Sequence, residues 1–237
     1  MIFKKILNKI VDLFFPPRCT ICDDVINGTN GICNACKEKV RLLQGSVCMV
    51  CGKKLNEDTV YCYDCIRKKH EFIRNFAVFE YPVIKESLYR FKYKGRAEYA
   101  AYYAKSAFLL HGEKLMQLHA DAIIPVPLHI SRYRKRGYNQ AEEFAKKLSE
   151  YIHVPVQQQK LKRIKATKAL KTMDVSGRQN NLKKAFLFMQ NDVKLKTIIV
   201  VDDIYTTGST LDEIARTCKE AGVKDIYTLT IAVGNGL

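Results

Sequence analysis

Two patterns of apolar residues alternate along the chain after position 70. One is a short unbroken run, and the other is a stripe of apolar residues spaced three or four positions apart, as on one face of a helix. The runs are rich in β-branched and aromatic residues and predict strands, at 70–80, 121–127, 185–189, 196–201 and 226–233. The stripes predict helices, at 83–93, 97–119, 138–151 and 209–221. This alternation is typical of an α/β fold with a mostly parallel sheet flanked by helices. The stretch 158–184 is basic and lacks apolar spacing, so we expect a long mobile loop there.

The first fifteen residues carry apolar side chains at positions 3, 6, 7, 10, 13 and 14, which form one face of a helix. Lys9 and Asp12 interrupt the apolar run and no small-residue cleavage site follows, unlike a signal peptide. We interpret residues 1–16 as an amphipathic helix docked on its own protein, with a membrane-surface or partner-binding helix as the alternative. No run of eighteen apolar residues occurs, which argues against a transmembrane segment.

Eight of the nine cysteines form four Cys-x-x-Cys pairs, and the last two pairs repeat the first two 29 positions later. Each repeat holds two pairs separated by ten residues, the pattern of a zinc ribbon with four thiolate ligands. The predicted ligands are Cys19, Cys22, Cys33 and Cys36 in the first repeat and Cys48, Cys51, Cys62 and Cys65 in the second. The repeat favours pairing within each unit, and a pairing swapped between units remains open.

A disulfide framework is the competing interpretation of these cysteines, but it requires an oxidising compartment. No export signal is recognisable, so we expect reduced thiols and two zinc ions. Both sites are closed by four thiolates, so the zinc is structural, and metal binding would supply most of the folding energy of so short a segment. Cys218 stands apart in the predicted helix 209–221 and is interpreted as a core residue.

The chain is strongly basic, with 40 Lys and Arg, 24 Asp and Glu and a formal charge of +16 over 237 residues. Each zinc bound by four thiolates carries a charge of −2, so two sites lower the total to about +12. The remaining positive charge lies mainly after residue 70, which favours phosphate ligands or nucleic acid as partners of that part. The stretch from Lys160 to Arg178 contains seven Lys and Arg residues and a single acidic residue, Asp174.

The most informative motif is the run 198–210, in which four β-branched apolar residues lead into two adjacent carboxylates and a hydroxyl-rich turn. Asp202 and Asp203 would lie at the carboxyl edge of a parallel sheet, where ligands bind. The turn (Thr206, Thr207, Gly208, Ser209 and Thr210) offers backbone N–H groups and hydroxyls at a helix N-terminus, which suits an anion. Acids beside such a turn suit a sugar phosphate, although Asp, Ser and Thr also serve as ordinary turn and cap residues.

This run resembles the PRPP-binding motif of type I phosphoribosyltransferases. The resemblance implies that Asp202 and Asp203 hold the ribose 2′ and 3′ hydroxyls and that residues 206–210 bind the 5′-phosphate. A second basic run follows Pro125-Val126-Pro127 and holds Arg132, Arg134, Lys135 and Arg136. These residues would contact pyrophosphate or a nucleic-acid backbone, and a solvated basic loop is the alternative.

The second run, with Arg136-Gly137-Tyr138-Asn139-Gln140, resembles the signature of the ComF family of competence proteins. Further family positions are Thr167, Arg178, Asn181, Ala185 and Phe186, and the chain departs from the family at Leu170, usually Gln, and at Met173, usually Leu. Arg178 joins the residues expected to contact pyrophosphate or nucleic acid. With the cysteine pairs and the turn 91–96, the resemblance covers nearly the whole chain.

The resemblance implies a type I phosphoribosyltransferase fold over 71–237, a double zinc ribbon over 17–70, and Mg²⁺ bound with PRPP. It also implies a role in natural transformation: uptake of single-stranded DNA in the cytoplasm, beside the membrane DNA channel and an ATP-driven competence translocase. Tyr133 and Tyr138 are candidates for stacking on bases. Two alternatives remain, a working phosphoribosyltransferase of unknown acceptor and a zinc-ribbon scaffold with a vestigial site.

Overall fold

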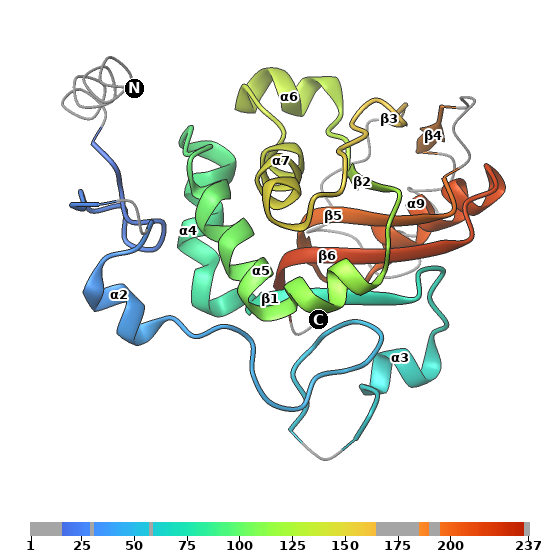
Figure 1. Cartoon of the computed structure of the whole chain (residues 1–237), viewed down its shortest axis with the longest axis horizontal. Coiled ribbons are helices and arrows are strands. Elements are labelled where there is room, and N and C mark those ends of the chain that lie inside the picture. Colours follow the sequence, from blue (N-terminus) through green and yellow to red (C-terminus); the bar gives the residue numbers. More distant parts are fainter. Residues whose placement is uncertain (1–15, 29–30, 57–58, 165–184, 190–194, 235–237) are drawn as a thin grey trace.

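The computed structural model describes residues 16–28, 31–56, 59–164, 185–189 and 195–234 (Figure 1). The expected N-terminal helix 1–16, apart from residue 16, lies outside the described residues, and so do Thr167, Leu170, Met173, Arg178 and Asn181. Within the described part of the chain, no helix has the length and apolar character needed to cross a bilayer.

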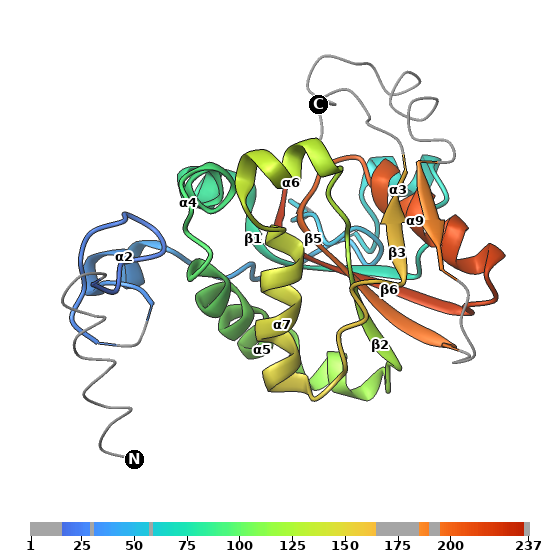
Figure 2. The same ribbon diagram turned by 90° about the horizontal axis from the view of Figure 1, so that it is seen from above.

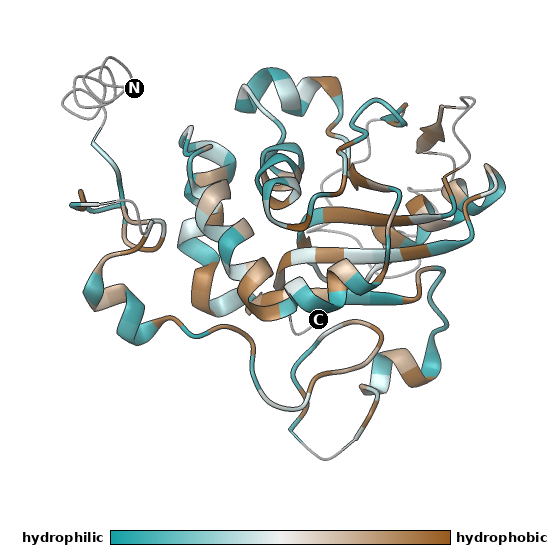
Figure 3. Cartoon of the chain, viewed as in Figure 1, coloured by the Kyte–Doolittle hydropathy of each residue, from teal (hydrophilic) through white to brown (hydrophobic). Residues whose placement is uncertain are grey.

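Four parallel strands form the central sheet, in the order β1-β6-β5-β2. They are β1 (Arg74–Glu80), β2 (Ala122–Pro125), β5 (Thr197–Tyr205) and β6 (Asp225–Val233). Beyond β2, Val156 forms a parallel bridge with Ile123 and extends the sheet. The α/β fold with a mostly parallel sheet is therefore confirmed, and the apolar strands lie between more polar helices (Figure 3).

Helices cover both faces of the sheet, as the alternating pattern predicts. Helices α5 (Tyr99–Gln117) and α7 (Gln140–Ile152) pack on each other and on one face, and α9 (Ser209–Glu220) lies on the other (Figure 2). The remaining helices are α2 (Asn34–Lys39), α3 (Tyr63–Arg67), α4 (Tyr81–Tyr93) and α6 (Ile130–Arg136). Cys218 is buried in α9, as expected.

Three local predictions were wrong. The acids do not follow β5 but lie within it, because β6 continues the ladder from Asp202 opposite Thr230 to Tyr205 opposite Val233. The Arg-rich run after Pro127, interpreted from the sequence as a loop, is instead the short helix α6. It is ended by Gly137 at φ 82°, a left-handed conformation that glycine adopts without strain.

The third wrong prediction concerns the small sheet. Strand β4 (Phe186–Phe188) does not join the parallel sheet but pairs antiparallel with β3 (Leu161–Arg163), inside the expected loop. Leu161 pairs with Phe188, and Leu161 and Phe186 are both buried, so apolar burial explains why a mainly basic stretch contains a strand.

Candidate functional site

The candidate site lies where the chain leaves β2 and β5 in opposite directions. From β2 the chain runs to α7 on one face of the sheet, and from β5 it runs to α9 on the other (Figure 2). Loops that part in this way leave a crevice at the carboxyl ends of the two strands, which is the usual ligand position in open α/β sheets. The acids of β5, the loop before α9 and helix α6 all belong to this edge.

Asp203 has a cationic partner that the sequence did not indicate. Lys92 Nζ, near the end of α4, lies 2.9 Å from Asp203 Oδ1, and both side chains are mostly buried. The Asp203 N–H donates to Asp202 Oδ1 at 2.8 Å. The two acids are thus held in different ways, one by an ion pair and the other by a backbone amide.

Asp202 is the more perturbed acid. Burial and the neighbouring Asp203 carboxylate raise the pKa of Asp202 to about 7, although the Asp203 amide, Lys92 and Arg163 act in the opposite direction. Asp202 therefore takes up or releases a proton near neutral pH, where an ordinary carboxyl is fully ionised.

Asp202→Asn is expected to remove a pH-dependent cost of folding. Native Asp202 keeps its proton up to about pH 7, whereas an unfolded aspartate loses it near pH 4, so stability falls as pH rises between these values. The free energy of unfolding of the wild type should therefore drop by about 2 kcal/mol from pH 5 to pH 8 through this group, and that of the variant should not. Urea unfolding at both pH values measures the difference. Asp225→Asn, at an exposed position, should keep the wild-type fall, and an unchanged fall in Asp202→Asn would contradict the assignment.

The loop between β5 and α9 has the geometry of an anion cradle. Gly208 adopts φ 73° and precedes the first residue of α9, which has no side-chain cap. A Cβ at Gly208 would lie 2.8 Å from both His70 Cε1 and the Tyr205 hydroxyl, so the close packing requires glycine. The hydroxyls of Thr207 and Ser209 are 3.1 Å apart. Free N–H groups and hydroxyls at a helix start suit a phosphate.

A buried carboxylate fixes this loop to residues 68–71, at the end of the second ribbon. Asp212, in the first turn of α9, accepts from Lys68 Nζ at 2.6 Å and from the Glu71 N–H at 3.0 Å, and it lies 2.9 Å from His70 Nδ1. Lys68 also donates to the Thr207 carbonyl at 3.3 Å. Burial alone would raise the pKa of Asp212, but the contacts with His70 and Lys68 lower it. Sequence reasoning missed this network because its members are about 140 positions apart.

Arg163 lies near Asp202 and near Arg132, and sequence reasoning missed it. Burial and the charge of Arg132 lower the pKa of Arg163 to about 10, while Asp202 raises it. Arg163 therefore stays charged at neutral pH. It lies on β3, in a stretch where only a loop was expected. Arg132, from α6, was a predicted contact residue, and the structure brings it near Arg163, which in turn lies near Asp202.

The other residues of α6 separate into two groups. Arg136 donates to Gln140 Oε1 at 2.6 Å and lies over the Tyr93 ring. Arg134 and Lys135 are exposed and form no ion pair within the described residues. The basic run therefore presents part of its charge to solvent and part to the sheet edge.

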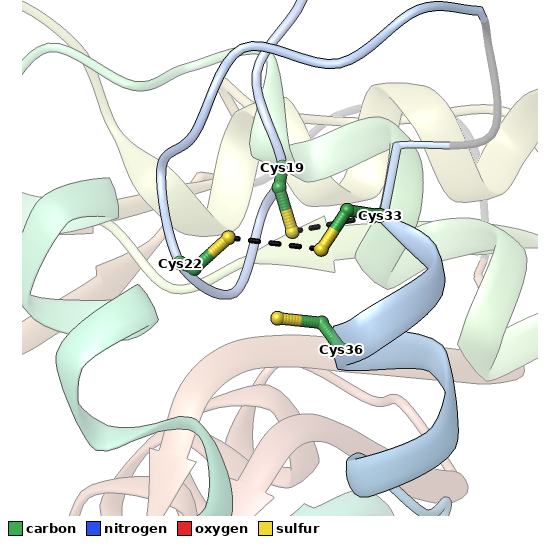
Figure 4. A group of neighbouring side chains, drawn as sticks. All are labelled: Cys19, Cys22, Cys33 and Cys36. Atoms are coloured by element: carbon green, nitrogen blue, oxygen red, sulfur yellow. Dashed lines mark hydrogen bonds between the residues drawn. The ribbon is translucent and has the colours of Figure 1, made fainter.

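Each cysteine repeat forms its own four-sulfur cluster. Within each cluster the sulfurs lie within 4.8 Å of one another, and Figure 4 shows the sulfurs of the first cluster directed toward a common centre. Neighbouring sulfurs are 3.8 Å apart between Cys22 and Cys33 and 3.6 Å apart between Cys51 and Cys62. A disulfide needs about 2.05 Å, whereas a zinc tetrahedron with bonds of about 2.3 Å gives about 3.8 Å. The clusters fit two structural zinc ions, paired within the repeats.

The two ribbons dock on different parts of the α/β domain. In the first ribbon, Asp23 pairs with Arg96 at 2.8 Å and accepts from the Tyr99 hydroxyl at 2.5 Å. In the second, the Leu43 N–H donates to the Val78 carbonyl at 2.9 Å, and the Asn75 N–H donates to the Val50 carbonyl at 2.7 Å. The second ribbon thus covers the free edge of β1.

Comparison with known proteins agrees with this architecture. A double zinc ribbon domain model matches residues 10–66, and a phosphoribosyl transferase domain model matches residues 104–236. The chain is 31% identical over 201 residues to competence protein ComFC of Bacillus subtilis, covering 81% of this chain and 79% of that protein. The chain belongs to the ComF family.

Other relatives of this ComF-family protein match over a greater length. Competence protein F of Haemophilus influenzae is 29% identical over 226 residues, covering 92% of this chain and 98% of that protein. DNA utilization protein YhgH of Escherichia coli K12 is 30% identical over 209 residues, covering 86% and 91%. The family resemblance and the type I phosphoribosyltransferase fold with two zinc ribbons are therefore confirmed.

Proposed function

We propose that this ComF-family protein binds PRPP or a related sugar phosphate and assists the uptake of single-stranded DNA in natural transformation. The observation that carries the first half is the placement of Asp202 and Asp203 beside the 206–210 loop, at the edge where β2 and β5 part. Carboxylates accept from sugar hydroxyls, and the loop offers N–H groups to a phosphate. The second half is supported by relatives named for competence and for DNA utilization.

In this proposal each part of the site binds one part of PRPP. Asp202 and Asp203 hold the ribose hydroxyls, and Thr206, Thr207, Gly208, Ser209 and Thr210 hold the 5′-phosphate. Arg132, Arg134, Lys135 and Arg136 of α6 contact the pyrophosphate or the nucleic-acid backbone, with Arg163 of β3 near Arg132. Mg²⁺ would enter with the pyrophosphate and neutralise its charge, and the carboxylate and hydroxyl oxygens of the site are the hard ligands that it prefers.

The proposed division of the chain is a helix over 1–16, the ribbons over 17–70 and the PRPP-binding domain over 71–237. We place the protein in the cytoplasm, at the inner face of the membrane only through partners such as a competence ATPase or helicase. Its basic surface suits contact with DNA.

A working phosphoribosyltransferase is the second candidate, and the pKa of Asp202 favours it. A carboxyl group that titrates near pH 7 suits proton transfer to or from an acceptor. Neutralising the negative charge of the departing pyrophosphate would make its bond to the ribose easier to break. Release of pyrophosphate from PRPP in the presence of candidate acceptors measures this activity, and binding without release would limit PRPP to a ligand.

The Asp202→Asn/Asp203→Asn variant is expected to bind PRPP roughly 30- to 100-fold more weakly than the wild type, because the carboxyl groups of both residues are lost as partners of the ribose hydroxyls. Isothermal titration calorimetry with Mg²⁺ measures the affinity. Asp225→Asn, on the exposed first residue of β6 at the opposite edge of the sheet, is the matched control and should bind as the wild type does. Equal affinity in all three proteins would place PRPP elsewhere, and no binding in any would remove PRPP from the proposal.

A further inference from the structure

Three planar groups lie in a row on the surface beside the candidate site. Tyr89 and Tyr93 occupy one face of α4, with ring centroids 5.2 Å apart. Arg136 of α6 lies over the Tyr93 ring, 4.9 Å from its centroid, and donates to the Tyr93 hydroxyl at 3.2 Å. The row joins two helices that are more than 40 positions apart in sequence.

These rings are accessible and do not belong to the core. Tyr89 is 50% exposed and Tyr93 is 48% exposed. Tyr133, on the adjacent helix α6, is 45% exposed. Tyr138 differs, because it is partly buried against Phe91 and its hydroxyl donates to the Phe91 carbonyl. Of the two tyrosines that the sequence suggested for stacking, only Tyr133 therefore has a ring open to solvent.

The surroundings of the row are positive. The segments 87–97 and 122–141 contain no Asp or Glu, and they hold Arg90, Lys92, Lys94, Arg96 and the four basic residues of α6. Of these, Lys92 is paired with Asp203 and Arg96 with Asp23. Lys94, Arg134 and Lys135 are exposed and form no ion pair among the residues that the structure describes. Cations with no internal partner are available for phosphate groups.

We propose that Tyr89, Tyr93 and Arg136 form a stacking platform for the bases of single-stranded DNA, with Lys94, Arg134 and Lys135 on its phosphates. Exposed rings within a basic groove are the common element of proteins that bind single strands, because every base has a face that stacks. In a duplex the bases are stacked on one another inside the helix and cannot reach the tyrosine rings. We therefore expect the platform to bind single-stranded DNA more tightly than double-stranded DNA. This inference names the DNA-binding surface of the proposed function and rests on its second half.

The platform adjoins the sugar-phosphate site through α4. Lys92, the residue before Tyr93, points to Asp203 at 2.9 Å, while Tyr93 meets Arg136 of α6. A strand on the platform would pass the mouth of that site.

Removing the rings is expected to weaken binding of a fluorescein-labelled dT20 oligonucleotide roughly 10- to 100-fold, since stacking contributes about 1–3 kcal/mol per base. Fluorescence anisotropy of Tyr89→Ala/Tyr93→Ala measures the affinity. Tyr89→Phe/Tyr93→Phe keeps both rings and should bind within a few-fold of the wild type. Tyr63→Ala is the matched control, because Tyr63 is also exposed, at 68%, and also lies under an arginine, Arg67 at 5.0 Å.

The dependence on salt separates stacking from charge. The alanine variant should lose affinity equally at all salt concentrations, whereas Arg134→Ala/Lys135→Ala should reduce the slope of log K against log[salt] by about 1 to 2. Wild-type affinity in Tyr89→Ala/Tyr93→Ala, or an equal loss in Tyr63→Ala, overturns the platform while leaving DNA binding intact. A wild type that binds no oligonucleotide, or that binds anionic vesicles in its place, overturns the DNA half of the proposed function itself.

Discussion

Cys65→Ser is expected to release one zinc ion, unfold the second ribbon and lower the thermal midpoint by roughly 10 °C or more. A structural zinc site contributes folding free energy on the order of 10 kcal/mol, which the ribbon loses with its fourth ligand. The destabilisation reaches the sheet because this ribbon hydrogen-bonds to the β1 edge at two positions, Asn75 and Val78. An uncovered edge strand also exposes unpaired backbone groups and promotes aggregation.

Metal content and thermal unfolding together measure this result. The wild type should hold two zinc ions, and both Cys65→Ser and Cys36→Ser should hold one. Cys36→Ser should be the milder change for the sheet, because the first ribbon docks on the start of α5 rather than on a strand. Cys218→Ser is the control, since this cysteine is buried in α9 outside both clusters and should leave two zinc ions in place. Full zinc content in Cys65→Ser would contradict the ligand assignment.

Asp212→Ala is expected to lower the free energy of unfolding by about 3–5 kcal/mol, because it leaves a largely buried Lys68 and His70 without their carboxylate. The pKa of native Asp212 lies below its ordinary value, so its stabilisation is present above about pH 4 and is lost as pH falls further. Urea unfolding at pH 7 measures the loss. PRPP affinity should fall as well. Lys68 donates to the Thr207 carbonyl at 3.3 Å, and without Asp212 this lysine no longer positions the proposed phosphate-binding loop.

Two further variants show whether this effect is specific. Asp225→Ala removes an exposed aspartate with no ion pair among the described residues and should change the unfolding free energy by less than about 0.5 kcal/mol. Lys68→Met keeps the apolar length of the side chain but removes its charge. The free energy of PRPP binding should fall by more than the free energy of unfolding does. If Asp212→Ala is as stable as Asp225→Ala, the network does not hold the loop.

Features that repeat over short distances were predictable. The strand core 198–201, the helix beginning at Ser209 and the end of the first predicted strand at residue 80, before Pro82, follow from side-chain spacing and from the missing amide of proline. The end of β5 was not predictable, because its last residues are strand only through pairing with β6. The β3–β4 pair was missed for the same reason, since neither short strand has a pattern of its own.

The sequence by itself determined the chemistry of this protein: eight thiolates in two repeats, two adjacent acids before a hydroxyl-rich turn, and an Arg-rich run after a proline-rich strand end. Only the tertiary structure decided which groups act together. Lys92 with Asp203, His70 with Asp212, and Tyr93 with Arg136 are pairs separated by more than 40 positions. Spacing along the chain sets which face of an element a residue occupies, but the meeting of two faces depends on the order of strands in the sheet and on the side to which each helix crosses.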